Sequence, residues 1–233
     1  MQTTLSQSMT LAEKVEISKL VIQYTLEKYP RTFAACSFGK DSRVIVDLAT
    51  QVRPDIPFIG IDTGFEFAET LSYADELVRE TGIRFRWVRP SEEARRRIDE
   101  EYGDAFIKND QYKCCEMKIP AIEAVMGEYQ AWITGLRRDE TEYRKNTKLI
   151  EFGKTVKANP IAFWTKDDVW RYIKENNLSF HPLYEQGFTS LGCRPCTTQG
   201  KVRSGGGRQG QFERAGRFAG TGHQGQECGL HLV

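Results

Sequence analysis

The alternation of apolar and polar positions predicts helices that alternate with short strands. Residues 11–28 place apolar side chains at helical spacing, and Pro30 ends this stretch. Further helices are expected over 44–49, over 68–80 and over 165–176, the last with Thr165 as its N-cap. Short apolar runs predict four strands between these helices, at 32–36, 57–61, 83–88 and 131–134.

Strands and helices that alternate in this way form a mainly parallel sheet with helices on both faces. In α/β folds of this kind, ligands bind beyond the carboxyl ends of the strands. Loops follow three of the predicted strands, at 37–42, 62–64 and 135–144. We therefore expect these three loops to converge on one site.

The composition divides the chain near residue 200. With 233 residues, 39% of them hydrophobic and 28% charged, the chain is long enough for one substantial core. Residues 200–228, however, include nine glycines and few apolar side chains, so they cannot form a core of their own. We predict an α/β domain over 1–199 and a mobile C-terminal tail over 200–233.

The net charge of +1 gives no bulk attraction to nucleic acid or to a membrane surface. Residues 1–30 contain no apolar segment behind a basic start, and no apolar run reaches membrane-spanning length. The expected location is therefore the cytoplasm, where thiols stay reduced and disulfides are rare. No nucleic acid and no membrane is expected as a partner, and a homo-oligomer is left open.

Six cysteines carry the most specific signal in the chain. Four of them form two close pairs, Cys114 with Cys115 and Cys193 with Cys196. Four thiolates suffice for a zinc ion or for an iron–sulfur cluster. Adjacent side chains diverge, which suits a larger cluster better than a compact zinc site, but the residues alone leave both open. A fifth cysteine, Cys228, lies on the glycine-rich tail and suits a nucleophile.

Residues 37–42, Ser-Phe-Gly-Lys-Asp-Ser, follow a predicted strand and begin a helix. Backbone N–H groups at such a helix N-terminus bind oxyanions, Gly39 permits close approach, and Lys40 adds a positive charge. The loop lacks the Walker A spacing and resembles the PP-loop of the adenine nucleotide α-hydrolase-like superfamily, Ser-Gly-Gly-x-Asp-Ser. Phe38 stands where that pattern has its first glycine. Asp62-Thr63-Gly64 resembles the superfamily's second nucleotide-contacting turn.

Several short motifs occur in the order typical of one enzyme family. They are Lys113-Cys114-Cys115, Thr134-Gly135-Leu136-Arg137-Arg138, His181-Pro182-Leu183-Tyr184, residues 190–197 (Ser-Leu-Gly-Cys-Arg-Pro-Cys-Thr) and residues 227–231 (Glu-Cys-Gly-Leu-His). From about residue 30 to its end, the chain thereby resembles the assimilatory adenylyl-sulfate reductases, the cluster-bearing branch of the phosphosulfate reductases. Each motif is weak alone, but the ordered set is specific.

The resemblance implies a 4Fe–4S cluster bound by Cys114, Cys115, Cys193 and Cys196, and adenylyl sulfate (APS) as the substrate. It implies that Cys228 attacks the sulfur of APS, which releases AMP and leaves a Cys–S-sulfonate. Thioredoxin or a similar dithiol carrier would then release sulfite through a mixed disulfide. The sixth cysteine, Cys36, is expected only to pack in the core.

The resemblance also implies which residues contact the substrate. Arginines of a strand-end loop and of the tail offset the charge of phosphate and sulfate, and the tail is expected to order over the bound anion. The family's Arg-Lys pair after the double cysteine is absent, so Lys118 is the candidate cation near the sulfate and Lys113 the alternative. The full expected set is Ser37, Phe38, Gly39, Lys40, Ser42, Asp62, Thr63, Lys118, Gly135, Arg137, Arg138, Arg214, Arg217 and His231.

Three other functions stay open as alternatives. The first is the same chemistry on 3′-phosphoadenylyl sulfate (PAPS), or on both nucleotides. The second is an ATP-dependent, cluster-bearing tRNA sulfur transferase, which the altered PP-loop, the terminal motif and the lack of a basic RNA-binding face disfavour. The third is a zinc-binding module without catalytic activity.

Overall fold

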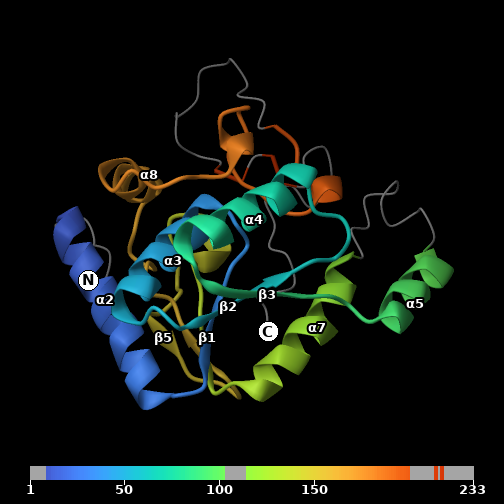
Figure 1. The fold of residues 1–233 in the computed structure, drawn as a ribbon, viewed down its shortest axis with the longest axis horizontal. Helices are drawn as coiled ribbons and strands as arrows, with labels where there is room; N and C mark the ends of the chain where they lie inside the picture. Colours follow the sequence, from blue (N-terminus) through green and yellow to red (C-terminus); the bar gives the residue numbers. More distant parts are fainter. Residues whose placement is uncertain (1–8, 103–113, 200–212, 215, 218–233) are drawn as a thin grey trace. The chain divides into compact units, whose positions relative to one another are not determined.

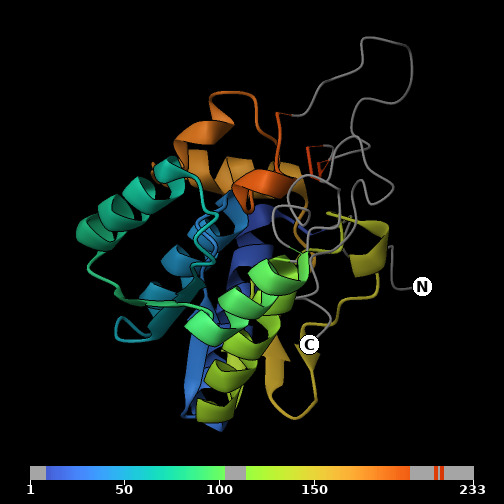
Figure 2. The ribbon, with the colours of Figure 1, turned by 90° about the vertical axis from the view of Figure 1, so that its right-hand side faces the viewer.

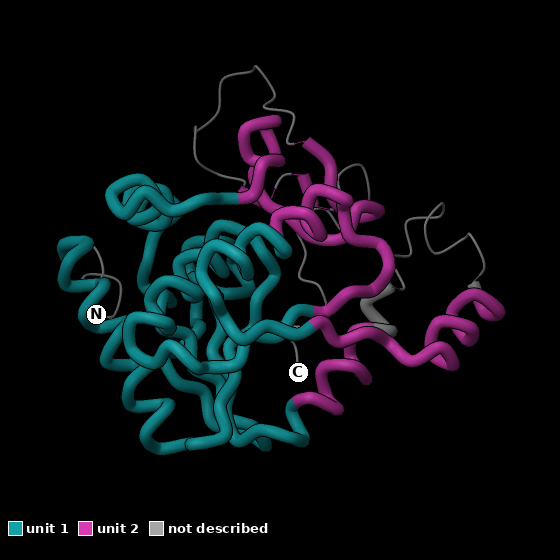
Figure 3. The backbone as a smooth tube through the Cα atoms, in the orientation of Figure 1, with its two compact units in different colours: residues 1–60, 74–86, 126–180 teal, residues 61–73, 87–125, 181–233 magenta. Residues whose placement is uncertain are grey.

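The computed structural model describes residues 9–102, 114–199, 213, 214, 216 and 217, with side chains described from Lys118 onward in the second range. These residues belong to two compact units, which Figure 3 shows in different colours. The first unit comprises residues 1–60, 74–86 and 126–180, and the second comprises residues 61–73, 87–125 and 181–233. The boundary expected near residue 200 stays a prediction, because most of the residues beyond it lie outside the described part.

A six-stranded sheet runs through the described residues in the order β3-β2-β1-β4-β6-β5 (Figures 1 and 2). Its strands are β1 (Thr32–Ala35), β2 (Pro57–Ile61), β3 (Arg84–Val88), β4 (Ala131–Ile133), β5 (Ile150–Glu151) and β6 (Val156–Ala158). β1 pairs in parallel with β2 and β4, and β4 pairs in parallel with β6. The short β5 pairs with β6 in the antiparallel direction. The predicted mainly parallel α/β fold is confirmed.

The helices α2 (Leu11–Lys28), α3 (Lys40–Val52) and α8 (Lys166–Glu175) belong to the first unit. A capping box begins α2 at Thr10 and another begins α8 at Thr165, the N-cap that the sequence predicts. Lys14 of α2 is buried and forms an ion pair with Asp168 of α8 at 2.6 Å. Ser18, also on α2, donates a hydrogen bond to Pro160 O and accepts one from Trp164 Nε1. Polar contacts therefore fasten α2 to the segment that leads into α8.

The helices α5 (Glu92–Tyr102) and most of α7 (Cys114–Glu128), with the 3₁₀ turns η2 (Pro182–Tyr184) and η3 (Arg194–Cys196), belong to the second unit. The helix α4 (Ala68–Thr81) begins in this unit and ends in the first. His181 Nδ1 accepts the Leu183 N–H, and His181 Nε2 lies 2.9 Å from Thr70 Oγ1. Burial lowers the pKa of His181 to about 4, against a smaller opposing effect of the Glu69 charge. The neutral imidazole thus ties the start of α4 to η2.

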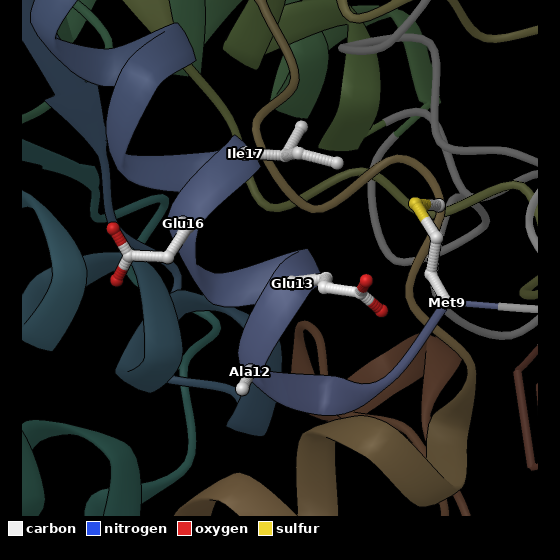
Figure 4. A pocket seen from close by; sticks show the side chains of 5 residues that line it. All are labelled: Met9, Ala12, Glu13, Glu16 and Ile17. Carbon is white, nitrogen blue, oxygen red and sulfur yellow. The ribbon is translucent and has the colours of Figure 1, made fainter.

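A shallow hollow beside the start of α2 is lined by Met9, Ala12, Glu13, Glu16 and Ile17. Met9, Glu13 and Ile17 project from one side of the chain, as their spacing of four residues requires (Figure 4). None of these side chains belongs to the expected site. Within the described residues, no helix has both the length and the apolar character that a membrane span needs.

Candidate functional site

The loop between β1 and α3 closes on itself through two serines. The Ser37 N–H donates to Ser42 Oγ at 3.0 Å, and the two hydroxyl oxygens lie 2.9 Å apart. Gly39 is the N-cap of α3 and has extended backbone angles, and it provides no side-chain cap. Gly39 thus supplies no side chain to cap the N–H groups that begin α3, and the N-terminus of a helix is a position at which anions commonly bind.

Phe38 has a positive φ of 60°, a left-handed conformation that favours glycine. Its ring is almost fully buried and packs edge-on against Phe85, with ring centroids 5.1 Å apart. Phe38 therefore adopts a backbone conformation that glycine reaches more easily, while its side chain packs inward. The sequence analysis expects Phe38 to contact the substrate. In the structure its ring lies in the core, so the ring itself is not exposed to a ligand.

The half-buried Asp41 is the centre of a charge network with two buried cations at the same loop. Lys40 Nζ lies 2.8 Å from Asp41 Oδ2, and Arg137 Nε lies 2.6 Å from Asp41 Oδ1. Burial alone would raise the pKa of Asp41, but the positive charges of Lys40 and Arg137 outweigh it, and the pKa lies below its usual value. The carboxylate therefore stays ionised and holds both cations.

The same network brings two of the predicted loops together. A Cβ added at Gly135 would lie 3.2 Å from the backbone of Asp41, so the loop after β4 approaches the start of α3 closely. Arg137 is fully buried and reaches both Asp41 and Asp139. Arg138 instead donates to Thr147 O at 2.6 Å. Loops 37–42 and 135–144 converge within the first unit as expected, whereas 62–64 belongs to the second unit.

In the second unit, the Asp62-Thr63-Gly64 turn forms as a tight turn. Asp62 accepts the Gly64 N–H at 2.8 Å and pairs with Arg89 at 2.9 Å, and Gly64 has a φ of 81°. Thr63 Oγ1 lies 3.2 Å from Glu66 Oε1 and 3.6 Å from Cys193 Sγ. This turn, assigned from the sequence to nucleotide contact, therefore also touches a cysteine of the expected metal centre.

The two cysteine side chains of the Cys193–Cys196 turn, which comprises η3 and the preceding cysteine, are buried and pack against Phe65. Cys193 Sγ lies 3.4 Å from Glu66 Oε1, and Arg217 Nη2 lies 3.5 Å from Cys196 Sγ. The hydrogen bond with Cys193 and then burial raise the pKa of Cys196, although the charges of Arg217 and Lys118 act in the opposite direction. The Cys196 thiol is therefore held in its neutral form.

Arg217 is held against the backbone of this turn. Its Nη1 donates to Leu191 O at 2.7 Å, and a Cβ at Gly192 would overlap its guanidinium group. Arg214 is buried as well, and its carbonyl accepts the Arg217 N–H at 2.8 Å. Both tail arginines expected in the substrate site therefore lie with the cysteine turn. The remaining expected tail residues, Cys228 and His231, lie outside the described residues.

Glu66 was not predicted from the sequence as part of the site. Burial raises its pKa to about 7, the neighbouring Cys193 adds to this effect, and the Lys118 charge opposes it. Lys118 of α7 thus acts electrostatically on both Glu66 and Cys196, and its role near a cluster stays a prediction. No local pattern marks Glu66, because its contact with Cys193 spans 127 positions.

The two described cysteines of the expected cluster site, Cys193 and Cys196, have the burial and spacing that metal ligands need. Two buried thiols lie three positions apart on one turn, and a buried thiolate requires a compensating positive charge that bound iron would supply. Cys114 and Cys115 begin α7. Among the described side chains, no group of three or more His, Cys, Asp or Glu residues could hold a metal ion.

Residues 31–199 match the family model of the phosphoadenosine phosphosulfate reductase domain. A protein of Staphylococcus haemolyticus named adenosine 5'-phosphosulfate reductase is 36% identical over 85% of this chain and 80% of its own length. A protein of Halalkalibacterium halodurans with the same name is 34% identical over 91% of this chain and 90% of its own length.

Among solved structures, the phosphoadenylyl-sulfate reductase of Candida auris in its phosphate complex aligns with a TM-score of 0.64. The match has 22% identity and covers 76% of this chain and 88% of that chain, a likeness of fold. The family model covers most of the chain. The two relatives named above align with this chain over most of their own length. The chain is therefore an enzyme of the phosphoadenosine phosphosulfate reductase family.

Proposed function

We propose that this enzyme reduces APS to sulfite and AMP in assimilatory sulfate reduction, with a dithiol as the electron donor. The observation that carries the proposal is the buried Cys193–Cys196 turn, on which the charges of Lys118 and Arg217 act. A cationic environment of this kind suits an anionic substrate and an attacking thiolate. The names of the two relatives give the substrate class.

The nucleotide part of the substrate is assigned to the loop before α3. The N–H groups after Gly39 offer an anion site, and the Lys40–Asp41–Arg137 network fixes the backbone that presents them. Arg137 is already paired with Asp41, so its contribution to binding includes holding the loop in place. Ser37 and Ser42 support the same loop through their mutual hydrogen bonds.

The chemical step is assigned to Cys228. Its thiolate attacks the sulfate sulfur of APS, so that a sulfur–sulfur bond forms, the sulfur–oxygen bond to AMP breaks, and AMP leaves with the electron pair. One thiol of the carrier then attacks the Cys228 sulfur, which expels sulfite and forms a mixed disulfide. The second carrier thiol displaces Cys228, and the carrier leaves oxidised by two electrons.

A 4Fe–4S cluster bound by Cys114, Cys115, Cys193 and Cys196 is part of the proposal. When bound, it supplies a polarisable charged group beside the sulfate. The chain's own residues perform the other tasks: Lys118 and Arg217 offset negative charge at the turn, and Arg214 supports Arg217 through the backbone. Thioredoxin is the proposed carrier, and the cytoplasm the proposed compartment, because thiols stay reduced there.

PAPS is the second candidate substrate, since both the family model and the Candida auris structure carry its name. A sulfite-release assay with reduced thioredoxin and either APS or PAPS distinguishes the two. Sulfite from APS at the higher kcat/KM supports the proposal, and a preference for PAPS would replace the substrate while keeping the chemistry. Turnover of ATP in place of both nucleotides would refute it. Analysis of iron and acid-labile sulfide separates a cluster from zinc.

A further inference from the structure

Arg138 differs from Lys40 and Arg137, the other cations that the sequence predicts for the nucleotide site in the first unit. Lys40 and Arg137 both pair with the carboxylate of Asp41. Arg138 follows in the loop after β4, and among the described residues no carboxylate forms an ion pair with its guanidinium group. Its Nε donates instead to an uncharged acceptor, Thr147 O, at 2.6 Å. Arg138 therefore keeps a positive charge that can meet an anionic ligand.

The ring of Phe163 forms the second contact of this guanidinium group, within the same unit. The guanidinium carbon of Arg138 lies 4.3 Å from the centre of the ring, inside the distance of about 6 Å at which a cation and an aromatic face attract each other. The Arg138 N–H also donates to Ala162 O at 3.0 Å, so the two backbones are bonded beside the ring. Among the described residues, the terminal nitrogens Nη1 and Nη2 have no acceptor, so their N–H donors remain for a ligand.

Asn159, which is fully buried, fixes the segment 147–149 that supplies the carbonyl acceptor. Its Nδ2 donates to Lys148 O at 2.7 Å, and its backbone N–H donates to Leu149 O at 2.7 Å. Its Oδ1 accepts the Thr134 hydroxyl at 2.5 Å, at the beginning of the loop that follows β4. One side chain thus ties both segments together, and an arginine held in this way loses less side-chain freedom when it binds a ligand.

We propose that Phe163 is a positioning residue for Arg138: its ring, together with Thr147 O, holds the guanidinium group so that Nη1 and Nη2 bind an oxyanion of the nucleotide. The inference rests on the proposed function, because the oxyanion is the phosphate or the sulfate of APS. Ligands of parallel α/β folds bind beyond the carboxyl ends of the strands, where the loop after β4 begins. A planar guanidinium group binds such an anion through two N–H groups at once, which requires a fixed orientation. Phe163 therefore acts on nucleotide affinity through Arg138.

The test compares Phe163→Leu, which removes the aromatic face, with Phe163→Tyr, which keeps it. Phe152→Leu, at an exposed phenylalanine of the same unit, is the matched control. Arg138→Ala and the double variant Arg138→Ala/Phe163→Leu complete a double-mutant cycle, which isolates the coupling between the two side chains. For each full-length protein, calorimetric titration gives the Kd of AMP, and sulfite release with reduced thioredoxin gives kcat and KM for APS.

We expect Phe163→Leu to weaken nucleotide binding about 5-fold, the size of a cation–π contact, and Phe163→Tyr to stay within about 2-fold of wild type. Arg138→Ala should weaken binding at least about 10-fold, because hydrogen bonds to a charged group are lost. In the Arg138→Ala background, Phe163→Leu should change binding by less than about 2-fold, because the ring has no guanidinium group to hold. Phe152→Leu should match wild type. Losses for both AMP and APS assign the contact to the phosphate, and a loss for APS alone assigns it to the sulfate.

Two results would overturn the inference alone. One is a Phe163→Leu variant that binds both nucleotides as wild type does. The other is an equal loss from Phe163→Leu with and without Arg138, because the ring would then act on something other than this arginine. A wild-type protein that binds AMP but releases no sulfite from APS would refute the proposed function, while AMP titration would still test Phe163. A wild-type protein that binds neither nucleotide would refute both.

Discussion

The loop at residues 37–42 and the cysteine turn at residues 193–196 differ in what their positively charged side chains contact. At the loop, the cations Lys40 and Arg137 meet the carboxylate of Asp41 at hydrogen-bonding distance. At the turn, Arg217 contacts a sulfur atom that is neutral until it loses a proton. In the loop, both cations are therefore paired with a carboxylate, and these ion pairs hold the backbone of the loop in place. At the turn, the charge would change if the thiols lost their protons to bind the proposed metal centre.

The largest expected effect concerns the cysteines. We ask whether sulfite formation depends on a cysteine of the second unit and not on the cysteine of the first unit. Replacing Cys228 by Ala should reduce sulfite formation by at least about 1,000-fold, because loss of a nucleophile removes the covalent step. The iron and sulfide content should be unchanged. The measurement is single-turnover sulfite release from APS, with AMP followed in parallel.

Cys36→Ala is the matched control in the first unit. Cys36 is buried as the sequence predicts, and burial raises the pKa of its thiol to about 12, so it does not supply a thiolate. Its replacement should leave sulfite release within about 3-fold of wild type. Loss of iron from Cys228→Ala would instead make Cys228 a ligand and contradict the proposed roles.

The next largest effect concerns the Asp41–Arg137 ion pair of the loop. Arg137→Ala should lower the free energy of unfolding by about 3 kcal/mol, because removal of the fully buried guanidinium group leaves the half-buried carboxylate of Asp41 with incomplete compensation. Urea denaturation measures the change. Arg171→Ala, which breaks an exposed pair with Glu175, should cost less than about 1 kcal/mol. Equal costs for the two variants would show that the Asp41–Arg137 bond does not hold the loop.

Local patterns in the sequence were sufficient for much of the fold. The helices over 11–28 and 165–176 carry both helical spacing and capping residues, and the structure confirms both. The strands β5 and β6 were not predicted, because two or three residues are too few to show alternation. The helix α7 was also missed, since it contains Pro120 and lacks a clear apolar stripe.

The site was predictable where chemistry is local and not where it depends on tertiary contact. The spacing of Cys193 and Cys196 identified the turn, and the structure places both in one buried cluster. The pairing of Arg137 with Asp41 spans 96 positions, so no short motif shows that this arginine is engaged inside the protein. Glu66 was missed for the same reason. Motifs identify reactive atoms, whereas the partners that orient them come from the fold.

A smaller effect tests the loop through Phe38. Phe38→Ala removes a buried ring and should cost about 3 kcal/mol in the free energy of unfolding. Phe38→Gly removes the same ring but relieves the left-handed strain, so it should be about 1 kcal/mol more stable than Phe38→Ala. Urea denaturation of both variants measures the difference. Glycine usually destabilises relative to alanine, so the usual order here would contradict the assigned conformation.

The smallest expected effect is a change in the free energy of unfolding with pH, which His181 of the second unit and Asp41 of the first unit influence in different pH ranges. The folded pKa of His181, about 4, lies below its ordinary value of roughly 6.5, so the unfolded chain takes up the proton first and stability falls as pH drops from 6.5 toward 4. The lowered pKa of Asp41 acts in the same direction but in a lower pH window, because its contribution is lost only as pH falls through roughly 4 and below. Between pH 7 and 5.5 the wild type should therefore lose roughly 1 kcal/mol through His181. Urea denaturation at the two pH values should show this loss in Asp41→Asn but not in His181→Gln. An unchanged loss in His181→Gln would assign the titration to another group and contradict a lowered pKa for His181.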